Sequence, residues 1–197
     1  MPPRTFFSAS QVWIQPGGKA KIEQKTMSPE LKAAIKDFVK KGGGYVGFCA
    51  GGFLASETLA WEEDDGSWYS APGLGLLKGR SLYYDQFQDV TEEDPARIAV
   101  TLWNGQKRHL YWELGPYFTA DAVAGSEGAV VARYDAGRIM TLRSEYGQGR
   151  VYVTAVHPEA PPDWSAGYGL KDPDGPDLSL AVEMIRWASA VPVTQPN

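Results

Sequence analysis

The 197-residue sequence has a single cysteine, only two histidines, no cluster of basic residues and no apolar run long enough to span a bilayer. One cysteine cannot form an internal disulfide, so the fold does not depend on an oxidising compartment. So few thiol and imidazole ligands argue against a structural zinc site, and we expect no metal and no other cofactor. Acidic residues outnumber basic ones by 24 to 19, which argues against nucleic acid as a partner.

Further absences bear on location and organisation. The start of the chain lacks a signal-peptide pattern, and with no membrane span this predicts a cytoplasmic protein that does not bind membranes. A missing N-terminal segment that carried a signal peptide would change that prediction. The sequence has no internal repeat and no long linker, and its 43% hydrophobic residues are ordinary for a globular protein. We therefore expect one domain over residues 1–197.

The first third of the chain alternates between strand and helix patterns. Residues 11–15 are β-prone and end at a Pro-Gly-Gly turn. Ser28 is the predicted N-cap of a helix with apolar residues at helical spacing, which three glycines at 42–44 end. A buried strand over 45–48 then leads into a helix that includes residues 53–55. This order of elements predicts parallel strand pairing in an α/β fold.

From about residue 74 the pattern becomes rich in β-strands, which predicts an antiparallel extension. Asn104-Gly105 between two β-prone runs is a strong hairpin signal. The acidic residues 62–65 are expected to form a solvated loop. The elements predicted here are strands at 98–103, 107–112, 130–134, 139–143 and 150–156, and a final amphipathic helix around 178–185.

Cys49 follows the buried strand directly and is surrounded by glycines, in the run Gly-Phe-Cys-Ala-Gly-Gly at residues 47–52. Glycines remove the Cβ atoms that would clash in a sharp strand-to-helix turn. A thiol on such a turn lies at a helix N-terminus, where unpaired backbone N–H groups favour a thiolate. The pattern therefore predicts a nucleophile elbow.

A cysteine nucleophile needs a base, and the base needs an orienting partner. His157 follows a predicted strand, so it should lie at the same carboxyl edge of the sheet as Cys49. Glu159 is spaced to hydrogen-bond its imidazole. The glycine turn at 16–18 could aim a backbone N–H at a developing oxyanion, and the N–H of Ala50 would be the second donor.

Each of these residues also has a simpler interpretation. Free cysteine is often a small buried core residue, and His157 alone could be a strand-end histidine satisfied by the backbone. Glu159 could simply follow Pro158 in a surface turn. His109 lies in a charged strand, where a solvated position is expected.

Three motifs in this order carry a family resemblance: Pro-Gly-Gly at 16–18, Gly-Gly-Tyr-Val-Gly-Phe-Cys-Ala-Gly-Gly at 43–52, and His-Pro-Glu at 157–159. Together they resemble the class I glutamine amidotransferase-like superfamily. Within it, the sequence is most similar to the family named for the N-terminal domain of biotin–protein ligases, which also occurs as stand-alone bacterial proteins. The resemblance implies a flavodoxin-like, mostly parallel sheet with helices on both faces.

The resemblance also implies roles for particular residues. It implies a Cys49–His157–Glu159 triad, with Gly18 and Ala50 forming the oxyanion hole. Residues 111–118 resemble the aromatic segment of the family. The residues that the resemblance would assign to substrate binding are Gly17, Tyr111, Glu113 and Tyr117, although those of the aromatic segment are more often core or rim residues.

The sequence departs from the family pattern at two places. Amidotransferases have a substrate-binding glutamine where this chain has Phe53, so glutaminase activity is not expected. The family also begins with a strand, a helix and a further strand before the Pro-Gly-Gly turn, and only about ten residues precede residue 11 here. Either the sequence is truncated or the sheet lacks these strands. An uncovered apolar edge is a liability for a monomer, and a homodimer is one arrangement that would cover it.

Three functions remain open at the level of sequence. The first is a cysteine-dependent hydrolase or amidase acting on a small amide, ester or peptide. The second is a non-catalytic domain that retains the pocket and binds a small molecule or a partner. The third, a redox-sensing thiol, ranks last because no second cysteine is present to resolve an oxidised state. The family name alone does not predict biotin chemistry.

Overall fold

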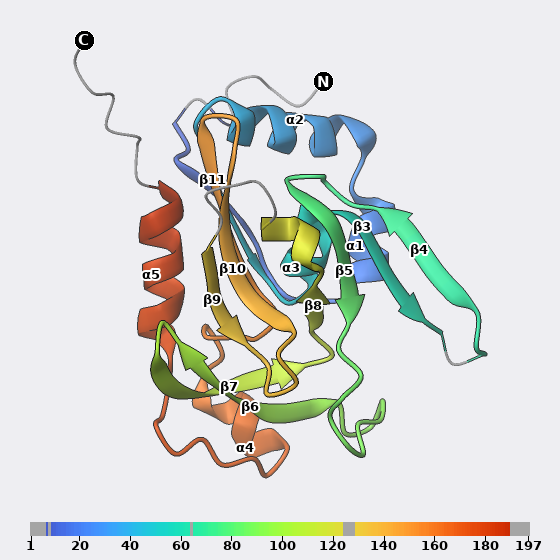
Figure 1. Ribbon diagram of the computed structural model, residues 1–197, viewed down its shortest axis with the longest axis vertical. Helices are drawn as coiled ribbons and strands as arrows, with labels where there is room; N and C mark the ends of the chain where they lie inside the picture. The colour runs from blue at the N-terminus through green and yellow to red at the C-terminus, as the bar shows by residue number, and fades with distance from the viewer. Residues whose placement is uncertain (1–6, 8, 64, 124–128, 190–197) are drawn as a thin grey trace.

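The computed structural model describes residues 7, 9–63, 65–123 and 129–189, which form a mixed α/β fold (Figure 1). One large sheet has the strand order β1-β2-β11-β10-β8-β5-β3-β4, with β9 paired to β10, and β6 and β7 form a separate hairpin. The strands are β1 (Val12–Gln15), β2 (Gly44–Phe48), β3 (Ser56–Glu62), β4 (Trp68–Pro72), β5 (Leu77–Tyr83), β6 (Ala96–Trp103), β7 (Gln106–Glu113), β8 (Pro116–Phe118), β9 (Ala129–Arg133), β10 (Ile139–Tyr146) and β11 (Gly149–Thr154). The helices are α1 (Ala20–Thr26), α2 (Pro29–Lys40), α3 (Ala50–Ala55), the 3₁₀ helix η1 (Ala120–Val123), α4 (Pro162–Gly167) and α5 (Leu178–Ser189).

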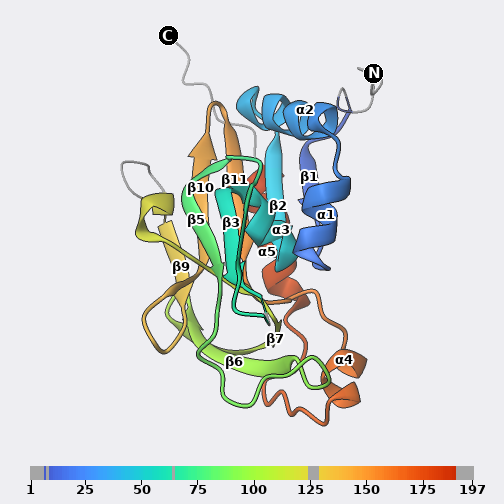
Figure 2. The same ribbon diagram turned by 90° about the vertical axis from the view of Figure 1, so that its right-hand side faces the viewer.

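Strands β1, β2 and β11 form a parallel block, and they lie side by side in Figure 2. Every residue of β2 is buried, as expected for a strand covered on both faces. Val46 and Tyr152 pack in a cluster with Met184 of α5, whereas Tyr45 packs on the opposite face in a cluster with Ile35 of α2. The flavodoxin-like arrangement, with helices on both faces, is therefore confirmed.

Strands β5, β8, β9 and β10 form the predicted antiparallel β-rich extension, which begins at about residue 74. Strands β3 and β4 precede that residue and were not predicted; β3 pairs antiparallel with β4 and parallel with β5. The Asn104-Gly105 hairpin is also confirmed, since Trp103 pairs with Gln106 across a two-residue turn. Both turn residues have positive φ, 48° and 82°, which is the type I′ geometry that Asn-Gly favours. In Figure 1 this hairpin crosses one end of the large sheet, next to α4.

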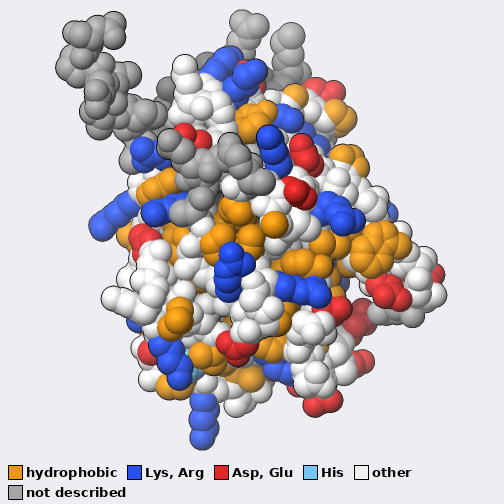
Figure 3. Space-filling model, viewed as in Figure 1, with side chains coloured by type: hydrophobic (Ala, Val, Ile, Leu, Met, Phe, Trp, Pro, Cys, Tyr) orange, Lys and Arg blue, Asp and Glu red, His pale blue; other side chains and the backbone are white. Residues whose placement is uncertain are grey.

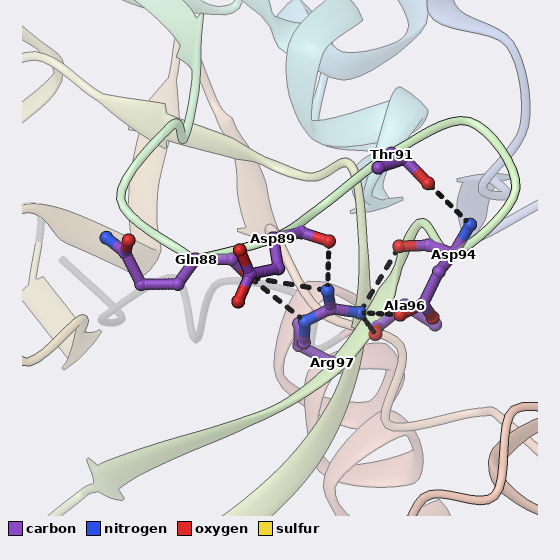
Figure 4. Close-up of polar contacts among 6 residues, drawn as sticks. All are labelled: Gln88, Asp89, Thr91, Asp94, Ala96 and Arg97. Atoms are coloured by element: carbon purple, nitrogen blue, oxygen red, sulfur yellow. Dashed lines mark hydrogen bonds and ion pairs between the residues drawn. The ribbon is translucent and has the colours of Figure 1, made fainter.

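The loop between β5 and β6 is held by Arg97 (Figure 4). Its guanidinium donates hydrogen bonds to the carbonyl oxygens of Gln88, Asp89, Asp94 and Ala96, of which the shortest are 2.6 Å. It also forms an ion pair of 2.9 Å with the Asp94 carboxylate. Because the planar fork of arginine presents several donors at once, one side chain fixes a segment that lacks strand pairing.

An aromatic cluster supports the end of β7. The Trp112 indole N–H donates to the Tyr134 hydroxyl at 3.0 Å, and that hydroxyl donates to the Pro116 carbonyl at 2.7 Å. Tyr134 also stacks on Tyr84 with ring centroids 3.6 Å apart. These buried, mutually satisfied contacts fix the backbone of Glu113, the residue after Trp112, which contributes to the site below.

At the surface, acidic and basic side chains are interspersed on the face shown in Figure 3. The acidic stretch only partly forms the predicted loop, because Glu62 is the last residue of β3 and pairs with Trp68. Residue 64 lies outside the described residues, and Glu63, in the loop, forms an ion pair of 2.7 Å with Lys21. Within the described ranges, no helix combines the length and apolar character needed to cross a membrane. Among the described residues, strand β1 forms one edge of the large sheet and pairs only with β2.

Candidate active site

Three parallel strands bring the sequence motifs to one edge of the sheet. Gln15 of β1 pairs in register with Gly47, and Thr154 of β11 pairs with Phe48. Since parallel strands run in the same direction, the chain segments after β1, β2 and β11 leave the sheet at the same edge. The Pro-Gly-Gly turn, Cys49 and His157 are the segments concerned.

Cys49 occupies a strained turn between β2 and α3. Its backbone has φ of 44° and ψ of −102°, a conformation that non-glycine residues rarely adopt. A Cβ added at Gly47 would lie 2.5 Å from the Gly51 carbonyl oxygen, and one at Gly51 would lie 2.2 Å from that of Gln15. Only glycine fits these close approaches, so the expected elbow is present. The Cys49 side chain is buried, with its Sγ 3.4 Å from the Glu113 carbonyl oxygen.

His157 is 6% exposed and is fixed from several sides. Its backbone N–H donates to the Tyr111 carbonyl at 2.8 Å, and its Nδ1 lies 2.9 Å from Glu159 Oε1. Because a carboxylate only accepts hydrogen bonds, Nδ1 carries a proton and Nε2 is left as the nitrogen available to Cys49. A Cβ on Gly17 would lie 2.3 Å from His157 Cε1, so the glycine turn lies directly against the imidazole.

Two aromatic rings flank the imidazole. The ring centroid of Tyr111 lies 5.9 Å from that of His157 and the centroid of Trp164 lies 5.5 Å from it, both in edge-on arrangements. The Tyr111 hydroxyl donates to Glu113 Oε2 at 2.7 Å. Burial, together with this carboxylate, raises the pKa of Tyr111 well above its ordinary value, so the hydroxyl stays protonated.

Opposing effects act on the charge of His157. Burial lowers its pKa, but the electrostatic interaction and hydrogen bond with Cys49, followed by those with Glu159, outweigh burial and raise the pKa to about 10. The arrangement therefore favours the protonated imidazole of His157 at neutral pH. The Glu113 carbonyl has the opposite effect on Cys49. It can accept a hydrogen bond only from a protonated thiol, so it favours the neutral form of Cys49.

The other predicted site residues are distributed as follows. Gly17 lies against His157, and no recorded hydrogen bond in the described part of the chain uses the backbone N–H of Gly18 or of Ala50. Tyr117 is apart from this group: it lies in β8, and the guanidinium of Arg138 lies 4.1 Å from its ring centroid. The structure thus brings all the predicted site residues except Tyr117 together at this edge of the sheet.

Sequence reasoning missed Trp164, because it lies on the short helix α4 within a segment that reads as a Pro/Gly/Asp-rich loop. The available signal was Pro162, since proline is favoured at the first position of a helix. Sequence reasoning also missed the Glu113 carbonyl as a neighbour of Cys49, which no side-chain pattern could reveal.

Comparison with known proteins assigns the sequence to a family. The family model described as "Biotin-protein ligase, N terminal" matches residues 5–173. The chain belongs to this family. A curated biotin–protein ligase from Schizosaccharomyces pombe is 27% identical over 170 residues, which cover 77% of this chain and 26% of the ligase. This chain therefore spans about a quarter of the length of that ligase.

Solved structures extend the comparison of the fold. A structure described as a glutamine amidotransferase matches with a TM-score of 0.60 at 18% identity, covering 91% of this chain and 80% of that one. At this identity the likeness concerns the fold alone. This member of the biotin–protein ligase N-terminal family thus has a glutamine amidotransferase-like fold, as the three sequence motifs predicted.

Proposed function

We propose that this protein is a cysteine-dependent hydrolase or amidase that acts on a small amide, ester or peptide. In this proposal Cys49 is the nucleophile, His157 the acid and base, and Glu159 the group that orients His157. The observation that carries the proposal is the strained Cys49 backbone next to a buried histidine whose protonated form is favoured by Cys49 and Glu159. Strained backbones and shifted pKa values both concentrate at functional sites.

The chemistry follows the usual course for a thiolate nucleophile. The Cys49 sulfur forms a bond to the substrate carbonyl carbon, and the bond from that carbon to the leaving nitrogen or oxygen breaks. His157 gives its proton to the leaving group. A water molecule then attacks the thioester: its oxygen joins the acyl carbon, one proton passes to His157, and the sulfur leaves as thiolate beside the imidazolium.

The tetrahedral intermediate of each step needs hydrogen-bond donors for its oxygen. We assign these to the backbone N–H groups of Gly18 and Ala50, because neither has a recorded partner within the described residues and both adjoin the reacting groups along the chain. Removing one such donor typically costs about a hundredfold to a thousandfold in rate.

The proposed substrate is not glutamine. Phe53 occupies the position of the glutamine side chain that amidotransferases use, and it is buried with its ring 5.6 Å from that of Trp61 in an edge-on contact. A buried aromatic side chain cannot supply the polar contacts that a glutamine substrate needs.

The proposal is tested by trapping the acyl-enzyme. The protein is mixed with p-nitrophenyl acetate, and release of p-nitrophenol and protein mass are followed in the wild type, Cys49→Ala and His157→Gln. We expect a burst of p-nitrophenol and one added acetyl group on Cys49 in the wild type alone. Acetylation elsewhere, or equal rates in all three proteins, would show that Cys49 is not a nucleophile.

A non-catalytic binding domain is the second candidate, and one observation favours it. The buried Cys49 thiol has the Glu113 carbonyl within 3.4 Å, and a thiol that donates there is not ionised. In that case Cys49 remains unacylated in the experiment above, while the protein still folds and binds its ligand.

A further inference from the structure

A cavity of about 230 Å³ adjoins the candidate active site on the side of α4. It shares Tyr111 and His157 with that site, but Cys49 is not among the residues that line it. Its volume is roughly seven to eight times the share of one water molecule in the liquid, which is room for about seven non-hydrogen atoms. The cavity is therefore a side chamber next to the reacting groups.

Along α4 and the residues next to it the wall of this chamber is apolar except for Ser165, and at the loop before α5 it is acidic. Proline and leucine side chains, including Pro161 and Leu170, line part of it, and Asp172 and Asp177 also line it. A chamber with an apolar wall and carboxylates on one side suits a ligand with an alkyl part and a polar, positively charged end.

Asp177 is the decisive residue of the chamber. It is only 7% exposed, and its side chain has no recorded hydrogen bond or ion pair within the described residues. By position it precedes the first residue of α5, where a carboxylate often caps the helix by accepting a backbone hydrogen bond. No such bond to its side chain is recorded; the N–H of Leu180 donates instead to the Asp177 backbone carbonyl at 2.7 Å.

The charges around Asp177 leave it without a counter-ion. Burial, followed by the negative charges of Asp172 and Asp174, raises its pKa to about 6, and Arg108 and His109 on β7 only partly oppose this. His109 is already engaged, because its Nδ1 lies 2.7 Å from the Asp174 carboxylate. A buried carboxylate in this state gains most from a ligand that supplies both a positive charge and N–H donors.

We propose that this chamber binds an alkylammonium group, such as the end of a lysine-like side chain or of a small diamine, through the Asp177 carboxylate. The remainder of the ligand then extends past His157 toward Cys49. This inference rests on the proposed function, because it specifies the substrate class of the same site: amides, esters or peptides that carry an aliphatic amine. Binding of the ammonium itself needs no catalysis.

The experiment measures binding of n-butylammonium chloride to the full chain by NMR, with the His157 ring and nearby amides as reporters. Butan-1-ol and butyrate serve as neutral and anionic probes of similar size. We expect butylammonium to bind with a Kd on the order of 1 mM and the other two at least tenfold more weakly. Asp177→Asn should weaken butylammonium binding at least tenfold, whereas Asp163→Asn, an exposed carboxylate of α4 that does not line the chamber, should leave it unchanged.

Dependence on pH supplies an independent readout. The titratable groups that surround Asp177 are Asp172 and Asp174 on its own loop, and Arg108 and His109 on β7. His157 lines the same chamber and, with a pKa of about 10, keeps its proton from pH 5 to pH 7, so it does not contribute to the change across this range. With a pKa of about 6 for Asp177, the affinity for butylammonium should rise roughly tenfold from pH 5 to pH 7, as the ionised fraction rises. Asp172→Asn is a second variant, expected to weaken binding, in case Asp177→Asn does not fold.

The outcomes separate this inference from the proposed function. Equal binding of butylammonium and butan-1-ol, or unchanged affinity in Asp177→Asn, overturns the ammonium chamber whatever Cys49 does. Binding that is retained in Cys49→Ala supports the chamber by itself. If the chamber binds butylammonium but Cys49 is never acylated, the chamber stands and the hydrolase does not.

Discussion

Replacement of Cys49 by alanine should lower the pKa of His157 by about two units or more. In the native protein that pKa is about 10, against an ordinary value of 6.5, and Cys49 is the first of the causes that raise it. The shift corresponds to roughly 5 kcal/mol in favour of the charged imidazole, of which we assign about half or more to Cys49. Once Cys49 is replaced, Glu159 alone raises the pKa of His157, and burial still lowers it.

The pKa can be measured directly by NMR, because the chain has only two histidines. The ring resonances of His157 are followed from pH 5 to 11 in the wild type, Cys49→Ala and Cys49→Ser. His109, which pairs with Asp174, is the internal control and is assigned with His109→Gln. The serine variant keeps a hydrogen-bonding group without a readily ionised thiol, so it separates the effect of charge from that of hydrogen bonding.

Stability should follow the same change. Because the pKa of His157 is raised by folding, its contribution is fully present below about pH 6.5 and is lost as pH rises toward 10. The free energy of unfolding of the wild type should therefore fall across this range, and that of Cys49→Ala should fall much less. A wild-type His157 pKa near 6.5, or one unchanged in Cys49→Ala, would refute the ion pair and leave the proton on the thiol facing Glu113.

Three other predictions concern the supports of the site and the fold. Glu159→Gln keeps a hydrogen-bond acceptor but removes the charge, so the His157 pKa should fall and acylation by p-nitrophenyl acetate should slow about tenfold to a hundredfold; an unchanged NMR titration would exclude Glu159 as a partner. Gly51→Ala places a Cβ against a backbone carbonyl and should cost about 2–4 kcal/mol in urea unfolding, whereas Gly167→Ala meets open space and should be near neutral; equal effects would contradict the account of the elbow. Arg97→Lys keeps the charge but loses the fork, so it should destabilise the protein by about 1–2 kcal/mol and speed amide exchange in the loop before β6; unchanged exchange would contradict the role assigned to this arginine.

Much of the fold is predictable because its signals are local. Ser28 accepts a hydrogen bond from the Leu31 N–H at 3.2 Å, as its position before a proline predicts. Asn104-Gly105 specifies its own turn. The glycines around Cys49 record close approaches that only a missing side chain permits, so the elbow is visible in the sequence.

The elements that sequence reasoning missed depend on distant partners. Helix α1 has no buried residue and no side-chain cap, so no apolar stripe marks it. Strand β8 has three residues and exists because β5 and β10 pair on its two sides. For the site, Asp177 looks in sequence like an ordinary helix cap, and only its burial beside Asp172 shows that its carboxylate faces a chamber. No pattern within one segment encodes these long-range contacts.

The central claim, that Cys49 is a nucleophile held ready by His157, is tested most directly by the rate of alkylation with iodoacetamide. At pH 7 we predict that Cys49 reacts faster than N-acetylcysteine, despite its burial, because the thiolate is the reactive species and the imidazolium stabilises it. His157→Gln should slow the reaction at least tenfold. Alkylation slower than that of N-acetylcysteine, and insensitive to His157→Gln, would show that Cys49 is a buried structural thiol.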